Sequence, residues 1–125
     1  MSEDRFRHGW ETVNRINAEG AQRQWDSLNA IAPDFARWIV ESAYADVLGR
    51  PQLSLRDREI ATLAALATLG HAPAQLKAHV EGALNVGLTR DEIVEVLMQM
   101  AVYAGVPAAI NALQTAGEVF AERGL

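Results

Sequence analysis

The stretch LKAHVEGALNVGLTRDEIVEVLMQMAVYAGVPAAINAL, residues 76–113, contains the signals that decide the fold. Gly87 suits the left-handed residue that ends a helix, and Thr89 with Glu92 three positions later forms a capping box that begins another. A Gly-Val-Pro sequence at 105–107 then separates this second helix from a third. No segment shows a convincing apolar and polar alternation of the kind that strands have. The sequence therefore predicts an all-α fold.

Apolar residues at helical spacing predict further helices toward the N-terminus. They recur through residues 6–16, after which Gly20 follows and a second helix contains Trp25. Pro33 suits the first turn of the next helix, because its missing N–H would be unpaired at that position in any case. We expect that helix to end at Gly49, where a turn begins.

The most apolar helix is expected near the middle of the chain. Ser54 and Asp57 resemble a capping pair, and only two threonines interrupt the apolar surface over residues 60–69. A helix that is apolar on nearly every side is buried on nearly every side, so we expect this to be the central helix. Pro73 then suits the first turn of the helix that carries His79.

Length and charge limit the class of protein. A chain of 125 residues has the size of one domain, and we expect a single compact multi-helix domain over residues 1–125. The net charge of −5 argues against nucleic acid, whose binding needs clustered cations. No run of about 18 apolar residues predicts a membrane span. The charged N-terminal sequence does not resemble a secretory signal, so we expect a cytoplasmic protein.

Residue types exclude several kinds of chemistry and favour self-association. The chain has no cysteine, which excludes disulfides, thiolate metal sites and a cysteine nucleophile. Its three histidines are scattered without a nearby second ligand, so no metal site is expected.

Alanine-rich apolar helices and three tryptophans demand much burial from a short chain, and we expect a homo-oligomer.

Glu59 and His79 are the candidates for acid and base chemistry. Glu59 shares a helical face with Leu63 and Leu66, and a carboxylate near an apolar interior must find a partner or take up a proton. Alternatively it is a first-turn glutamate that faces water and is favoured by the helix dipole. His79 is either a structural residue or an acid and base that a facing carboxylate would orient. The sequence leaves open whether the two side chains meet.

Three further side chains are candidates for ligand binding. Arg50 lies in a turn directly before a proline, where it either faces solvent or holds a carboxylate. The positive charge of Arg58 would partly neutralise the adjacent Glu59, and Arg58 is a second candidate for substrate binding. The hydroxyl of Tyr103, near a helix end, either donates to a ligand or caps a buried ring. His8 and His71 are weaker candidates.

Residues 76–113 closely resemble the C-terminal half of the carboxymuconolactone decarboxylase family. The stretch APDFARWIVESAYADVLGRPQLSLRDREIATLAAL, residues 32–66, follows the pattern of its N-terminal half. The resemblance implies a helical fold shared with alkylhydroperoxidase D and assembly as a trimer or hexamer. It also implies a cofactor-free carboxy-lyase that converts 4-carboxymuconolactone to the enol-lactone of 3-oxoadipate in protocatechuate catabolism, the β-ketoadipate pathway.

The alkylhydroperoxidase branch of this superfamily has two cysteines before its histidine, at the positions that Ala72 and Gln75 occupy in this chain. Both thiols are absent, so cysteine-based peroxidase activity is excluded. His79 matches the histidine of that branch, and Glu59 resembles its proton-relay glutamate. The decarboxylases more often have a small residue in place of Glu59, an aromatic residue in place of Leu48, and RPGL where this chain has RPQL.

Three functions are compatible with these observations. In the first, a decarboxylase, Arg50 holds the carboxylate that stays, Tyr103 or protonated His79 stabilises the oxyanion, and His79 supported by Glu59 donates the proton. The second is another cofactor-free proton-transfer or lyase reaction on a small organic acid, which Glu59 and the altered turn favour. The third is a non-catalytic oligomer that binds a small carboxylate or lactone.

Overall fold

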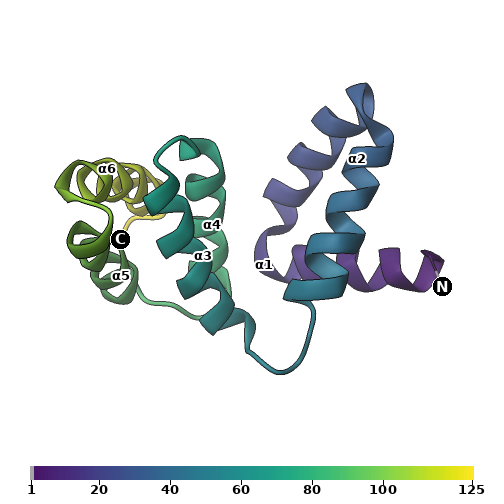
Figure 1. Ribbon diagram of the computed structural model, residues 1–125, viewed down its shortest axis with the longest axis horizontal. Helices are drawn as coiled ribbons and strands as arrows, with labels where there is room; N and C mark the ends of the chain where they lie inside the picture. The colour runs from purple at the N-terminus through teal and green to yellow at the C-terminus, as the bar shows by residue number, and fades with distance from the viewer. Residues whose placement is uncertain (1) are drawn as a thin grey trace. The chain divides into compact units, whose positions relative to one another are not determined.

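The computed structural model describes residues 2–125, and most of them lie in helices (Figure 1). These residues contain no strand, so the all-α fold predicted from the sequence is confirmed. The chain forms two compact units, one up to Leu55 and one from Arg56 to Leu125. Within the described residues, every helix is too short or too polar to cross a lipid bilayer. The expectation of a single domain stays a prediction.

The first unit contains α1 (Ser2–Ile31), α2 (Pro33–Trp38) and the π-helical segment η1 (Ile39–Leu48). Helix α1 is kinked at Asn17, where the backbone leaves the helical range (φ −157°, ψ 89°). The Asn17 side chain accepts a hydrogen bond from the N–H of Gly20 at 3.0 Å and so caps the second half of α1. The break expected at Gly20 therefore lies three residues earlier, because asparagine supplies the cap that glycine cannot.

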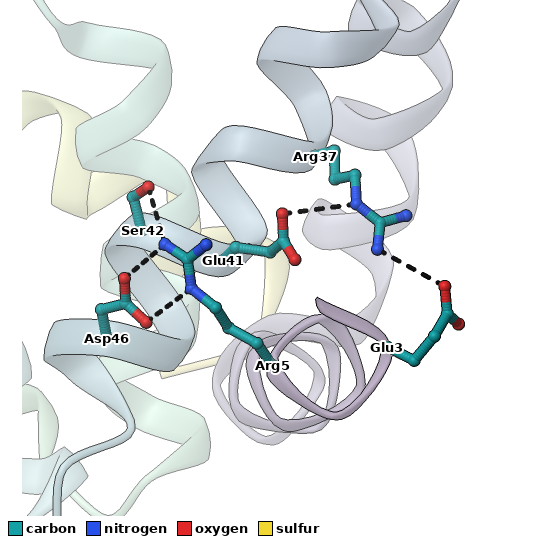
Figure 2. A network of polar contacts seen from close by, with 6 residues as sticks. All are labelled: Glu3, Arg5, Arg37, Glu41, Ser42 and Asp46. Atoms are coloured by element: carbon teal, nitrogen blue, oxygen red, sulfur yellow. Dashed lines mark hydrogen bonds and ion pairs between the residues drawn. The ribbon is translucent and has the colours of Figure 1, made fainter. Parts of the chain in front are cut away.

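Helix α1 packs closely against η1. A Cβ atom on Gly9 would lie 2.0 Å from the Val40 carbonyl oxygen, so only glycine permits this approach. Arg5 of α1 then donates to Asp46 at 2.9 Å and to Ser42 at 3.4 Å (Figure 2). The hydrogen bond from Arg5 holds the pKa of Asp46 below its ordinary value. These contacts join η1 to the first turns of α1, between residues as far apart in sequence as Arg5 and Asp46.

Glu41 is a buried charge of the first unit. Its Oε1 atom lies 3.3 Å from Arg37 Nε, and Arg37 also lies 3.8 Å from Glu3 (Figure 2). Its Oε2 atom is buried and has no hydrogen-bond partner among residues 2–125. The ion pair with Arg37 compensates the charge that the packing of η1 removes from water.

The second unit contains α3 (Leu55–Leu69), α4 (Pro73–Asn85), α5 (Arg90–Tyr103) and α6 (Val106–Glu122). A single cluster of buried apolar side chains joins these four helices. Its largest fully buried members are Leu63, Val80, Ile93, Leu97 and Val119.

Helix α3 is less buried than its composition predicts. Glu59, Leu63 and Ala67 form one buried stripe at intervals of four residues. Ala65 and Leu69, on other faces of α3, are exposed in the single chain. The expectation of a central helix is therefore wrong for the single chain, because an alanine-rich surface satisfies an apolar pattern without needing a partner on every side.

The predicted helix ends between α4 and α5 are confirmed. Gly87 has a φ of +108°, and the N–H of Leu88 returns to the Ala83 carbonyl at 2.9 Å, which is typical of a glycine-terminated helix. The Thr89 hydroxyl accepts from the N–H of Glu92 at 3.1 Å, and the Glu92 carboxylate accepts from the N–H of Thr89 at 2.9 Å. Both halves of the capping box are present.

Glu92 should make the stability of the protein depend on pH. The hydrogen bond from the Thr89 backbone, together with the Arg56 guanidinium, holds the pKa of Glu92 below its ordinary value. A lowered pKa means that the folded state favours the ionised form. The resulting stabilisation is present above the pKa of the unfolded chain and is lost as the pH falls through the folded value.

We therefore expect Glu92→Gln to lower the midpoint of urea unfolding at pH 7, and the gap from the parent protein to narrow as the pH falls toward 3. The Gln side chain keeps the cap but loses the charge. Glu95→Gln, an exposed change on the same helix, is the matched control and should leave the midpoint unchanged. A gap that stays constant with pH would refute the role of the Glu92 charge.

Candidate functional site

Glu59 of α3 and His79 of α4 meet in the second unit. The Glu59 Oε2 atom lies 2.9 Å from His79 Nδ1. The Glu59 side chain is 1% exposed and the His79 side chain 18% exposed. The sequence left this contact open, and the alternative in which Glu59 faces water is excluded by its burial.

The positions of the two residues on their helices explain how they come together. Leu63 lies one turn after Glu59 and is fully buried, so the apolar stripe of α3 directs the glutamate inward. On α4, Leu76 lies three residues before His79 and Ala83 four residues after it, and both are buried. His79 therefore lies on the face of α4 that packs against the core, where its ring is available to the buried carboxylate.

The burial of Glu59 determines the state of the pair. A carboxylate withdrawn from water needs a charged or hydrogen-bonding partner. Because an ionised carboxylate only accepts hydrogen bonds, it places the ring proton of His79 on Nδ1. This leaves Nε2 as the nitrogen that can exchange a proton with a ligand. Such an arrangement is chemically able to serve as an oriented acid and base.

One oxygen of Glu59 has an unusual environment. Oε1 is buried, and no group among residues 2–125 forms a hydrogen bond with it. Native interiors leave few polar side-chain atoms in this condition, and functional sites are common among the exceptions. The other such oxygen among the described residues is Oε2 of Glu41, which belongs to the ion pair with Arg37, so an unpaired oxygen alone does not identify a functional site.

The structure does not join the other predicted site residues to this contact. Tyr103 is the last residue of α5 and is 80% exposed. Arg58 is half-buried on α3 directly before Glu59, and successive helical residues point in different directions. Arg50 is exposed in the turn after η1, in the first unit. Their roles stay predictions.

A shallow depression of about 260 Å³ lies along α3, α4 and α6. Leu66 lines it two turns after Glu59, Leu76 lines it one turn before His79, and Asn111 contributes an amide. Glu59 and His79 are not part of its lining, so we place the candidate site at the acid and base pair rather than at the depression. Among the described residues no three histidine or acidic side chains are grouped to hold a metal ion.

Two polar contacts were missed by reasoning from the sequence. The buried Glu41 belongs to an Arg37–Glu41 pair whose spacing of four residues could have indicated it. His8, which the sequence suggests is a weak candidate, places its Nε2 atom 3.2 Å from the Gly49 carbonyl oxygen. These two residues are 41 positions apart, so no local pattern indicates that they meet.

Comparison with known proteins identifies relatives over nearly the whole chain. Residues 33–118 match the carboxymuconolactone decarboxylase family. The chain is 33% identical over 124 residues to 4-carboxymuconolactone decarboxylase of Acinetobacter baylyi. The aligned residues make up 98% of this chain and 92% of the relative.

Two other relatives are similar to this chain. An uncharacterized 15.0 kDa protein from the nqo9–nqo10 intergenic region of Paracoccus denitrificans is 29% identical over 115 residues, covering 91% of this chain and 86% of that protein. A nitrosuccinic acid decarboxylase of Metarhizium robertsii is 38% identical over 76 residues, covering 60% of this chain and 52% of that protein.

The Glu59–His79 contact leads to a prediction about stability. His79→Ala leaves the Glu59 carboxylate buried without this partner, and we expect a loss of ~1–3 kcal/mol in the free energy of unfolding. His79→Asn places an amide N–H near the position of Nδ1 and should retain most of that stability. Urea unfolding at pH 7 measures both, with His71→Ala at an exposed position as the control. Equal stability of the Ala and Asn variants would contradict this interpretation.

Proposed function

The chain belongs to the carboxymuconolactone decarboxylase family, and we propose on that premise that it is a carboxy-lyase acting on 4-carboxymuconolactone without a cofactor. The observation that supports this most strongly is the contact between Glu59 and His79. A carboxylate-supported imidazole can deliver the proton that such a reaction requires. A relative that spans 98% of the chain is named for the same substrate.

The chemistry of the substrate explains why no cofactor is needed. The departing carboxylate is attached to the ring carbon next to the double bond that is conjugated with the lactone carbonyl. When this C–C bond breaks, CO₂ leaves and the electron pair enters the ring as a dienolate, whose charge spreads onto the carbonyl oxygen. A proton added to ring carbon then gives the enol-lactone of 3-oxoadipate. The substrate is its own electron sink, so the protein needs to bind it, stabilise the charge and supply one proton.

We assign the proton transfer to Nε2 of His79. Glu59 accepts from Nδ1, so the opposite nitrogen is the one that can carry a transferable proton. The buried carboxylate also stabilises the positive charge of the ring before the proton leaves. Glu59 thus acts through His79, by fixing the orientation of the ring and supporting its charge.

Substrate binding is assigned to cationic and hydroxyl side chains. The forked donors of the Arg50 guanidinium match a carboxylate, and we propose that Arg50 holds the carboxylate that stays on the substrate. Arg58 is the second candidate for this role. Tyr103, whose side chain is exposed in the single chain, or protonated His79 would donate to the oxyanion of the dienolate.

In a second candidate function the same site acts on a different small organic acid as substrate. One relative is named as a nitrosuccinic acid decarboxylase, and this chain has Glu59, Leu48 and RPQL where the decarboxylases more often have other residues. Assays of decarboxylation, isomerisation and lactone hydrolysis on a panel of small acids distinguish the two functions. A complete absence of turnover would favour the third possibility, a non-catalytic oligomer that binds a ligand.

We also propose that the protein is a homo-oligomer, a trimer or a hexamer. Apolar side chains on α5 and α6 support this, since Val102 is 76% exposed and Val106 60% exposed, with Met98 and Ile110 also exposed. A surface of this kind usually marks an interface.

The proposed reaction belongs to protocatechuate catabolism, the β-ketoadipate pathway, and we place the protein in the cytoplasm, where that pathway provides its substrate.

Replacement of His79 tests the proposed reaction. His79→Asn keeps a donor toward Glu59 but removes Nε2, so we expect kcat on 4-carboxymuconolactone to fall about a hundredfold or more while the protein stays folded. His71→Asn, the same change at an exposed position, should leave kcat unchanged. Steady-state kinetics measure both variants. An unaltered kcat for His79→Asn would remove His79 from the mechanism.

The assembly is tested on the exposed apolar surface. Val102→Asp places a charge on this surface and should shift the oligomer toward monomer, because burial of an unpaired carboxylate in an interface is costly. Gln99→Asp, on the same helix at a position that is already polar, is the control. Size-exclusion chromatography with light scattering gives the mass of each. A parent protein that is monomeric at micromolar concentration would refute the proposed assembly.

A further inference from the structure

The peptide group that joins Gly49 to Arg50 is held at both of its polar ends. Its carbonyl oxygen lies 3.2 Å from Nε2 of His8, on α1. Its N–H, which belongs to Arg50, donates to the Val47 carbonyl of η1 at 3.2 Å. Because a peptide group is planar, two hydrogen bonds at opposite ends fix the orientation of the whole group. They therefore fix the position from which the Arg50 side chain departs.

Close packing around Gly49 supports this interpretation. A Cβ atom there would lie 2.6 Å from His8 Nε2, 2.7 Å from the Tyr44 carbonyl oxygen and 2.9 Å from Thr12 Oγ1. The φ of Gly49 is −84°, which any residue can adopt, so glycine is needed for space rather than for backbone conformation. Gly49 is thus closely packed between α1 and the C-terminal end of η1.

The residue after Arg50 restricts it from the other side. Pro51 disfavours the helical region for the residue before it and keeps Arg50 in extended or polyproline conformations. His8 and Val47 hold the peptide group before Arg50. Pro51 restricts the φ and ψ angles of Arg50 itself. A cationic side chain on such a fixed backbone loses less conformational freedom when it binds a carboxylate.

We propose that His8 is a positioning residue, which holds the Gly49–Arg50 peptide group and thereby fixes Arg50 for the carboxylate of the substrate. The proposal rests on the substrate-binding role assigned to Arg50 above. A carbonyl oxygen only accepts, so His8 donates from Nε2, and it can do so as a neutral or as a protonated ring. His8 acts through Arg50, without contacting the substrate itself.

A double-mutant cycle with 4-carboxymuconolactone tests this role. His8→Ala should raise KM about five- to tenfold and leave kcat nearly unchanged, because it removes one hydrogen bond that orients a binding residue. His8→Gln keeps an N–H donor at a similar distance from the backbone and should restore KM. Arg50→Ala should raise KM at least as much. The double variant should match Arg50→Ala alone, since His8 has no effect once Arg50 is absent.

A purely structural role for His8 gives a different result. It would lower kcat as well, or it would multiply the effect of Arg50→Ala, and either outcome overturns the proposal. Arg7→Ala, a neighbouring change on α1 whose side chain contacts Asp4, is the control and should leave KM unchanged. An unchanged KM for Arg50→Ala would refute both the role of Arg50 and that of His8.

Hydrogen exchange of the Arg50 amide gives a second test that needs no substrate. His8→Ala should speed this exchange several-fold, whereas His8→Gln and Arg7→Ala should not, because only loss of the bond to the Gly49 carbonyl releases the peptide group. A protein without turnover on the lactone would refute the proposed function alone. Exchange at Arg50 that is unchanged in His8→Ala would overturn the proposal about His8, whether or not the enzyme is active.

Discussion

The hydrogen bond between Glu59 and His79 is the interaction on which the second unit and its proposed chemistry depend. The carboxylate is 1% exposed and is directed inward by the same stripe of α3 that supplies Leu63 to the core. A charge in that position is tolerated only if a partner compensates it. The partner is an imidazole that is itself 18% exposed, so the pair connects the interior of the unit with its surface. We therefore expect the buried carboxylate to place the ring proton on Nδ1 and to leave Nε2 for the proposed chemistry.

Because the chain has no thiols, the Glu59–His79 pair is the remaining candidate for chemistry at this position in the fold. The chain has no cysteine, and the resemblance to the alkylhydroperoxidase branch implies that Ala72 and Gln75 stand where that branch has its two cysteines. Electron transfer by a thiol pair is therefore impossible, while the histidine and a supporting carboxylate are present. In the proposed function, the Glu59–His79 pair transfers a proton instead. The proposed substrate, 4-carboxymuconolactone, stabilises its own carbanion and would require little more.

The parts of the fold that follow from neighbouring residues could be predicted, and the parts that depend on distant residues could not. The all-α fold and the capping box of Thr89 and Glu92 follow from spacing and from local hydrogen bonds. The sequence predicts a break between two helices at Gly20, whereas the structure has the break at Asn17, because glycine and asparagine both interrupt helices and the sequence does not rank them. Glu59 and His79 could be named as candidates, but their contact spans 20 residues and depends on how α3 and α4 pack. The bond from His8 to Gly49 has no local signal at all.

The central claim is that Glu59 fixes the proton of the His79 ring on Nδ1 and so frees Nε2. Nitrogen-15 NMR of the labelled histidine side chains tests it most directly, because the shifts and proton couplings of the two ring nitrogens distinguish the tautomers. At alkaline pH we expect His79 to be the Nδ1–H tautomer and Glu59→Ala to abolish this preference, while His71 is unaffected. A His79 ring with its proton on Nε2 in the parent protein would contradict the account.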